Sequence, residues 1–367
     1  MQKKIIILCT VILIVVMEAL FALIGALMPG PFTGTVTDAE TNEPIANVSV
    51  SDGRNVVKTD ENGAYTLPGY SKSRFVTVTT PAGYWTENYY IPVTKDRETY
   101  DFRLDKSEKT AQADHSFLQI SDSEIGAKGV GAWIEHVRDT VKETDPAFLI
   151  HTGDICYEDG LKQHIKDMNT ENMGVPVRYV IGNHDYVAGK YGEALFESIY
   201  GPVWYSFDVG NVHYVVTPFQ TGADYASGYN KNDRWKWLEN DLANVEPGMK
   251  VVMFNHTKAP SDDYVLSYGL KKLDLKEHDL IAWVYGHYHY NYITETDGVL
   301  NISTGRPDCG GIDSSASGSR LISITANGQV STQMYYYDFE QPQAPDGANW
   351  SAQLEGNLLF ADPLAVG

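Results

Sequence analysis

Residues 177–185 read VRYVIGNHD, an apolar run that ends directly in the polar tetrad GNHD at 182–185. Four other apolar runs end in the same manner, in the polar clusters Asp122-Ser123-Glu124, Gly153-Asp154, Asn255-His256 and Gly286-His287-Tyr288-His289. Short apolar runs predict buried strands, and helical patterns at 133–141 and 235–245 lie between some of them. Strands that alternate with helices predict an α/β core, whose ligand crevice forms at the carboxyl ends of the strands. The sequence therefore predicts that five polar clusters meet at one edge.

The chemistry of these clusters indicates a metal centre. Carboxylate, amide and imidazole groups together suit hard to borderline divalent cations, and a carboxylate such as Asp154 can bridge two of them. We therefore expect two divalent ions (Mn, Fe, Zn or Mg) that activate water and hydrolyse a phosphate ester. The predicted metal ligands are Asp122, Glu124, Asp154, Asn183, His256, His287 and His289.

In order and spacing, the five clusters resemble those of the calcineurin-like metallophosphoesterases over residues 115–325. The resemblance implies a two-sheet α/β sandwich with a dinuclear site and a bridging hydroxide as the nucleophile. By position it assigns the first ion to Asp122 and His289 and the bridge to Asp154. It assigns the second ion to Asn183, His256 and His287. His184 would protonate the leaving group, with Asp185 steering it.

Glu124 departs from the family pattern. The family usually has Asp-x-His in its first cluster, whereas this chain has Asp122-Ser123-Glu124. A ligating glutamate would favour Mn, Mg or Ca over Zn and would lower the formal charge of the site by one unit. The sequence leaves open whether Glu124 binds metal or is a solvated bystander. The replacement also supports the alternative of a cell-surface binding protein with a degenerate, inactive site.

Two further residues are candidates for contact with substrate. Arg306 follows a predicted strand and could bind a phosphate oxygen, although a surface turn explains it equally well. Tyr157 lies three positions after Asp154 and could stack on a base or sugar, although packing is the commoner use of tyrosine. The neighbouring Cys156 is expected to be a buried free thiol.

The N-terminal residues 1–28 predict an export signal. Lys3 and Lys4 precede an apolar stretch, 5–28, that is long enough to span a bilayer as a signal peptide or a signal-anchor. Basic residues stay on the cytoplasmic side, so the rest of the chain is expected to be extracytoplasmic, either secreted or membrane-anchored.

Residues 29–105 predict a small all-β sandwich, because short alternating strands are separated by turn signals. The segment resembles carboxypeptidase regulatory-like modules, which implies a spacer or a surface for contact with a glycan or partner. Residues 106–114 read as a linker, 115–340 as the metallophosphoesterase domain and 341–367 as a C-terminal tail.

Charge and cysteine content narrow the class of protein. The formal net charge of −20 argues against a nucleic-acid partner, whereas a metal site still allows a small phosphorylated substrate. Three cysteines cannot form a disulfide framework, so the fold must be stabilised by packing.

Overall fold

The computed structural model describes residues 30–124, 131–187, 189–218, 226–307 and 317–337, and the backbone of 351–352. The predicted leader, 1–28, and all of the predicted tail except that dipeptide lie outside the described residues. No helix within the described ranges is long and apolar enough to cross a membrane.

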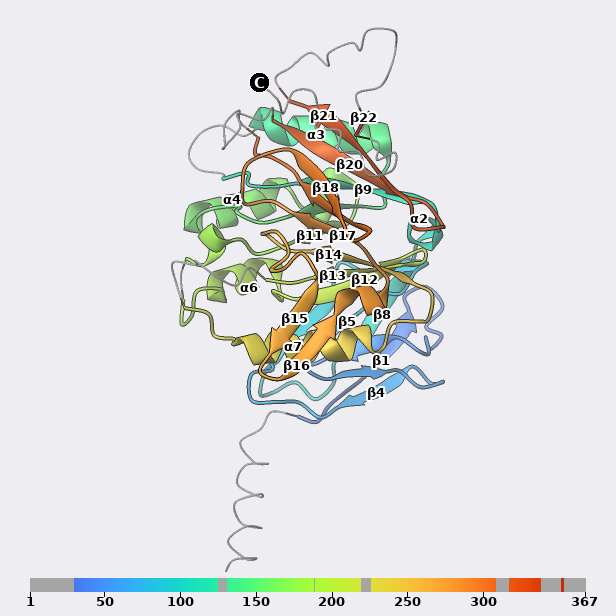
Figure 1. The fold of residues 1–367 in the computed structure, drawn as a ribbon. Helices are drawn as coiled ribbons and strands as arrows, with labels where there is room; N and C mark the ends of the chain where they lie inside the picture. The colour runs from blue at the N-terminus through green and yellow to red at the C-terminus, as the bar shows by residue number, and fades with distance from the viewer. Residues whose placement is uncertain are drawn as a thin grey trace, which may run out of the picture.

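The N-terminal domain consists of two four-stranded sheets (Figure 1). One sheet has the strand order β4 (Ala64–Leu67), β1 (Phe32–Asp38), β8 (Phe102–Lys106), β6 (Tyr84–Trp85). The other sheet has the order β3 (Val56–Lys58), β2 (Ser49–Ser51), β5 (Phe75–Val78), β7 (Tyr90–Pro92). Val36 and Leu104 of the first sheet are buried in the same cluster as Val50 and Val76 of the second. The two sheets therefore share one apolar core, as a β-sandwich requires.

The predicted linker, 106–114, contains a short helix. Helix α2 (Glu108–Ala111) begins after Ser107, whose side chain accepts a hydrogen bond from the Thr110 amide and caps the helix. The Thr110 hydroxyl donates to the backbone carbonyl of Tyr84. The backbone carbonyl of Thr110 accepts a hydrogen bond from the amide of Gly210. This short helix is thereby fixed to both domains.

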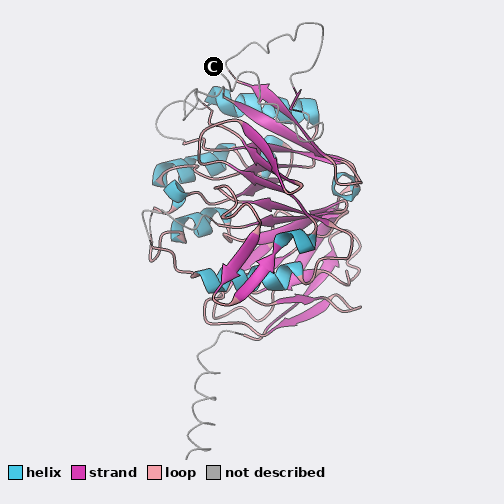
Figure 2. Ribbon diagram, viewed as in Figure 1, coloured by secondary structure: helices cyan, strands magenta, loops and turns pink. Residues whose placement is uncertain are grey.

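The second domain is built on two six-stranded sheets, and Figure 2 shows the strands in the middle of the molecule with helices at its margins. One sheet has the order β11 (Val177–Tyr179), β10 (Phe148–His151), β9 (His115–Ile120), β20 (Gly318–Ile324), β21 (Val330–Tyr336), β22 (Ser351–Ala352). The other has the order β12 (Tyr205–Val209), β13 (Val212–Val216), β14 (Lys250–Phe254), β17 (Leu280–Tyr285), β19 (Val299–Ser303), β18 (Tyr292–Thr296). Within them, β9, β10 and β11 are parallel, as are β13, β14, β17 and β19.

Aromatic side chains join the two sheets. Phe117 stacks on Phe148 at 4.9 Å between ring centroids, and both rings meet Phe254 of the other sheet edge-on. Edge-to-face pairs add to the free energy gained from burial alone. The predicted two-sheet α/β sandwich is thus confirmed.

Helices cover the outer surfaces. The predicted helices correspond to α3 (Gly131–Thr144), which buries Trp133 and Val137, and to α7 (Lys231–Leu242), which begins at the capping residue Asn230. The remaining elements of this domain are α4 (Glu158–Asp167), α5 (Thr170–Met173), η1 (Asn183–Asp185), α6 (Ala194–Tyr200), β15 (Val265–Tyr268), β16 (Lys271–Asp274) and η2 (Leu275–His278).

Candidate metal centre

The predicted ligands follow the ends of five strands. Asp122 and Glu124 come after β9, Asp154 after β10 and Asn183 at the start of η1, after β11. His256 comes after β14, and His287 and His289 come after β17. Because these strands run parallel within each sheet, their carboxyl ends lie at one edge, and the clusters meet there as predicted.

The chain turns sharply after each strand. Asp122, Asp154 and His287 have φ angles of 50°, 55° and 71°, in the left-handed region that non-glycine residues seldom adopt. Such strained backbone persists at functional sites because the surrounding structure fixes it. Gly286 allows the close approach of two strand ends, because a Cβ there would overlap the Ser121 hydroxyl and lie 2.5 Å from Asp122 Oδ2.

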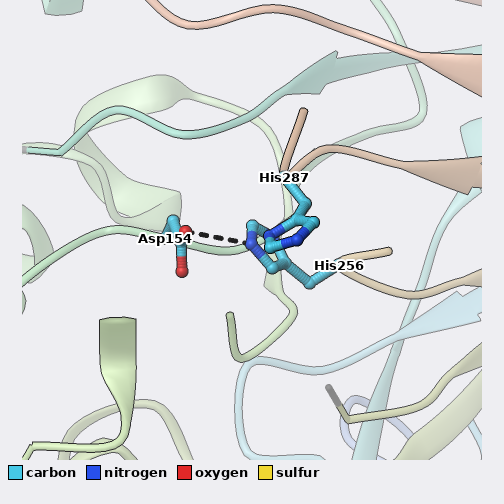
Figure 3. Close-up of side chains that lie close together, drawn as sticks. All are labelled: Asp154, His256 and His287. Atoms are coloured by element: carbon cyan, nitrogen blue, oxygen red, sulfur yellow. Dashed lines mark ion pairs between the residues drawn. The ribbon is translucent and has the colours of Figure 1, made fainter. Parts of the chain in front are cut away.

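The ligand atoms gather within short distances. His256 Nε2 lies 3.0 Å from Asp154 Oδ2 and 3.9 Å from Asp122 Oδ1, and His289 Nε2 lies 3.5 Å from Asp122 Oδ1. Asp154, His256 and His287 each offer an atom within 4.8 Å of the others. Figure 3 shows these three side chains close together. Glu124, Asp154 and His184 form a second such group, so Asp154 belongs to both.

Backbone amides orient the two central carboxylates. The amide of His287 donates to Asp122 Oδ2 at 2.9 Å, and the amide of His184 donates to Asp154 Oδ1 at 2.9 Å. Each carboxylate is therefore held by an amide of another cluster, which fixes the clusters relative to one another.

Two buried polar atoms at the cluster lack a partner among the described residues. Asn183 Oδ1 and His184 Nδ1 are removed from solvent, yet neither makes a hydrogen bond within that part of the chain. A buried polar atom without a partner costs about 1–3 kcal/mol, so these atoms favour a bound ion or substrate at the site. Oxygen and nitrogen donors grouped around two buried carboxylates fit divalent cations.

The buried charges compensate one another. Burial opposes ionisation of His256, but the charges of Asp154 and Asp122 outweigh it and raise the pKa of His256 to about 9. Burial likewise opposes ionisation of Asp154, but His256 and the His184 amide lower the pKa of Asp154. The two carboxylates thus favour positive charge between them, as a cation site requires.

Asp185 does not steer His184, contrary to the expectation from the family. Its carboxylate accepts hydrogen bonds from the amides of Asp154 (3.0 Å), Cys156 (2.9 Å) and Gly182 (2.9 Å). Both oxygens accept from these amides, and no described residue is a hydrogen-bond partner of His184 Nδ1. Asp185 is a positioning residue that holds the loops after β10 and β11 together.

The remaining candidates lie at the rim of the cluster. The Tyr157 ring is 58% exposed and lies 5.2 Å from the ring of His184. Arg306 Nη2 lies 2.8 Å from Glu124 Oε2, and its Nη1 lies 3.4 Å from His289 Nδ1. Arg306 thus contacts two predicted ligands. Cys156 is a buried free cysteine, as expected, and burial raises the pKa of its thiol.

Further residues, not predicted from the sequence, orient the ligands. His256 Nδ1 lies 2.8 Å from the carbonyl of Thr152, which makes Nδ1 the protonated nitrogen and leaves Nε2 for the cluster. His151 Nε2 lies 2.6 Å from the Ser123 hydroxyl. Both residues come directly before the Gly153-Asp154 cluster, but neither shows a motif that would indicate this role.

Family models match both domains of the chain. Residues 115–291 match the model described as Calcineurin-like phosphoesterase, and residues 30–107 match the N terminal of Calcineurin-like phosphoesterase. The chain therefore contains a calcineurin-like phosphoesterase domain preceded by the N-terminal domain of such proteins, and this supports phosphoester hydrolysis as its reaction. The resemblance of the first domain to carboxypeptidase regulatory-like modules stays a prediction.

Solved structures give distant likenesses. A dimetal phosphatase from Danio rerio is 12% identical, with 60% of this chain and 96% of that chain covered at a TM-score of 0.43. The phosphopantetheinyl hydrolase from Mycobacterium tuberculosis is 19% identical (53% and 91% covered, TM-score 0.38). An archaeal phosphodiesterase is 15% identical (60% and 99% covered, TM-score 0.31). No curated protein matches the chain.

Proposed function

We propose that this protein hydrolyses phosphate esters at a centre for two divalent metal ions. The observation that supports the proposal most is the meeting of two buried carboxylates, Asp122 and Asp154, around His256 at 3.9 and 3.0 Å. Carboxylates at this separation from one imidazole repel each other unless cations lie between them. The unpartnered Asn183 Oδ1 supplies a further ligand.

The contacts are consistent with a division of the ligands between two ions. Asp122 and His289, 3.5 Å apart, would hold the first ion, with Glu124 3.4 Å from the same imidazole. Asn183, His256 and His287 would hold the second. Asp154 would contribute to both, because it is grouped with His256 and His287 on one side and with Glu124 and His184 on the other.

When bound, divalent ions supply an activated water and neutralise the charge that develops on the phosphate. His184 lies beside Asp154 at the partly exposed side of the cluster, where its imidazole can give a proton to the leaving oxygen. The amide of His184 holds Asp154, so the same residue connects metal binding to protonation.

The alternative, a surface binding protein with an inactive site, depends on Glu124. The guanidinium of Arg306 lies 2.8 Å from this carboxylate and offsets the negative charge that replaces the family's imidazole. We therefore favour the enzyme.

From residues 1–28 we also propose an extracytoplasmic location. Protease treatment of intact cells would test this location, and protection of the phosphoesterase domain from the added protease would contradict it.

Metal analysis combined with hydrolysis assays tests the function. We expect the full chain to retain divalent metal after dialysis and to hydrolyse an aryl phosphate monoester or diester. Asp154→Asn should lose metal and lower turnover by more than about 100-fold, since even residues that only support metal ligands contribute about 10- to 100-fold.

Two variants serve as comparisons. Asp159→Asn, at an exposed carboxylate of α4, should change neither quantity. His184→Ala should lower turnover while most of the metal is retained. Full activity and full metal content in Asp154→Asn would contradict the proposed centre.

A further inference from the structure

A cavity of about 230 Å³ lies beside the metal centre. Helix α7 and strand β15, neighbours in Figure 1, contribute to its walls together with the ends of β14 and β17. Its apolar lining includes Leu238, Met253, Leu266 and Trp283. A cavity of about 150 Å³ is enough for benzene, so this one has room for a single ring with a substituent.

The cavity shares a wall with the metal centre. Asn255 and Thr257 line it, and they flank the predicted ligand His256. Tyr288 also lines it, and its ring packs edge-on against His287 at 4.9 Å between centroids. A hydrogen bond of 3.1 Å between the hydroxyls of Thr257 and Tyr288 joins the two stretches. A molecule bound at the metal ligands would therefore adjoin the cavity.

Arg234 introduces a cation into this apolar space. Its half-buried guanidinium has no ion pair and no hydrogen bond with any residue that the structure describes. The half-buried arginines Arg74 and Arg306, by contrast, pair with glutamates. Burial lowers the pKa of Arg234 to about 10, although the interaction with Tyr186 acts in the opposite direction. The guanidinium therefore stays protonated at neutral pH.

A second cation lies at the rim of the cavity. Lys258 is exposed, lines the cavity and follows His256 by two residues. No carboxylate lines this space among the described residues, although the chain as a whole has a net charge of −20. Two cations that have no acidic partner among the described residues, in a pocket whose other lining residues are apolar or uncharged, favour an anionic ligand.

We propose that this cavity binds the leaving group of the substrate, and that this group is a ring-sized apolar moiety bearing a second negative charge. The scissile phosphate would lie at the metal ligands. The distal carboxylate or phosphate would pair with Arg234 and Lys258. This inference rests on the proposed function and adds a substrate class to it.

Paired substrates test the proposal. Phenyl phosphate and 4-carboxyphenyl phosphate, each as the monoester and as its methyl diester, differ by one distal carboxylate. With the Mn²⁺-loaded full chain, Arg234→Met should lower kcat/KM for the carboxylated ester by about 10- to 100-fold, the usual value of a hydrogen bond to a charged group. The decrease in kcat/KM for the uncharged ring should be much smaller.

Two further variants make the result specific. Lys258→Met, at an exposed rim position where folding is not at risk, should also lower kcat/KM for the carboxylated ester, but less than Arg234→Met does. Lys236→Met serves as the matched control, because Lys236 lies on the same helix but pairs with Glu239 outside the cavity. For each variant, kcat/KM for the carboxylated ester is divided by kcat/KM for the phenyl ester. Comparing this ratio between variants cancels the intrinsic difference in leaving-group reactivity.

Binding of the product gives a readout independent of turnover. The full chain should bind 4-hydroxybenzoate more tightly than phenol in calorimetric titrations, and Arg234→Met should remove the difference. If both esters are hydrolysed and the ratio of their kcat/KM values is the same in wild type and Arg234→Met, the cavity assignment is wrong. The proposed phosphoesterase function would still stand. If no ester is turned over, both proposals are overturned together.

Discussion

Glu124 lies between an imidazole and a guanidinium at the edge of the metal centre. Its Oε1 is 3.4 Å from His289 Nε2, and its Oε2 is 2.8 Å from Arg306 Nη2. One carboxylate oxygen is thus available to the cluster while the other is paired with a cation. The net charge of the site is therefore close to that of a family member with an imidazole at this position.

We expect Glu124→His to shift metal preference from Mn and Mg toward Zn, because an imidazole replaces a hard oxygen ligand. Metal content should be measured after equilibration with an equimolar mixture of the three ions. Glu277→His, at an exposed position of η2, is the control. An unchanged metal ratio in Glu124→His would show that Glu124 is not a ligand.

At the scale of elements, a buried histidine connects α7 to the hairpin of β12 and β13. His213 Nδ1 lies 2.6 Å from Asp208, and its Nε2 lies 3.0 Å from Asp241 of α7. The Ser206 hydroxyl donates to the other oxygen of Asp241. Although burial opposes ionisation, the two carboxylates raise the pKa of His213 to about 10.

This contact predicts a pH dependence of stability. The folded-state pKa is higher than the unfolded value of about 6.5, so the stabilisation is complete below pH ~6.5 and is lost as pH rises toward 10. Urea denaturation between pH 6 and 10 should show this decline by a few kcal/mol. His213→Gln should be less stable at pH 6 and should lack that part of the decline.

His278→Gln is the matched control. It removes an imidazole from another half-buried position of the chain. The difference in unfolding free energy between wild type and His213→Gln should narrow as pH rises. A difference that is constant across the range would mean that His213 is neutral in the folded protein.

At the scale of the whole molecule, Arg74 joins the N-terminal domain to the phosphoesterase domain. Its guanidinium lies between the rings of Tyr191 and Tyr229, at 3.6 and 3.8 Å from their centroids, and pairs with Glu193 and Glu197. Both glutamates are buried. A largely desolvated cluster of one guanidinium and two carboxylates therefore contributes to the contact between the two domains.

Removing this cation should destabilise the protein strongly. Arg74→Met leaves two buried carboxylates without their counter-charge, and breaking a buried ion pair in this way costs about 3–5 kcal/mol. Chemical denaturation of the full chain measures the loss. Arg97→Met, at an exposed arginine of the same domain, should have little effect. Equal stability of the two variants would contradict the role of Arg74.

The β-rich domain, the α/β domain and the candidate ligands could all be predicted from local sequence patterns. Apolar runs that end in polar clusters, such as 177–185, are local patterns, and parallel strands bring their ends to one edge. Asp122, Asp154 and His256 could therefore be expected together before their distances were known.

The pairing of side chains could be known only from the folded chain. Asp185 accepts from backbone amides instead of contacting the His184 imidazole, and Glu124 meets Arg306 across 182 positions of the chain. Arg234 lines a cavity beside the metal centre and has no counter-ion among the described residues. Periodicity and turn signals act over a few residues, whereas these contacts depend on how distant elements pack.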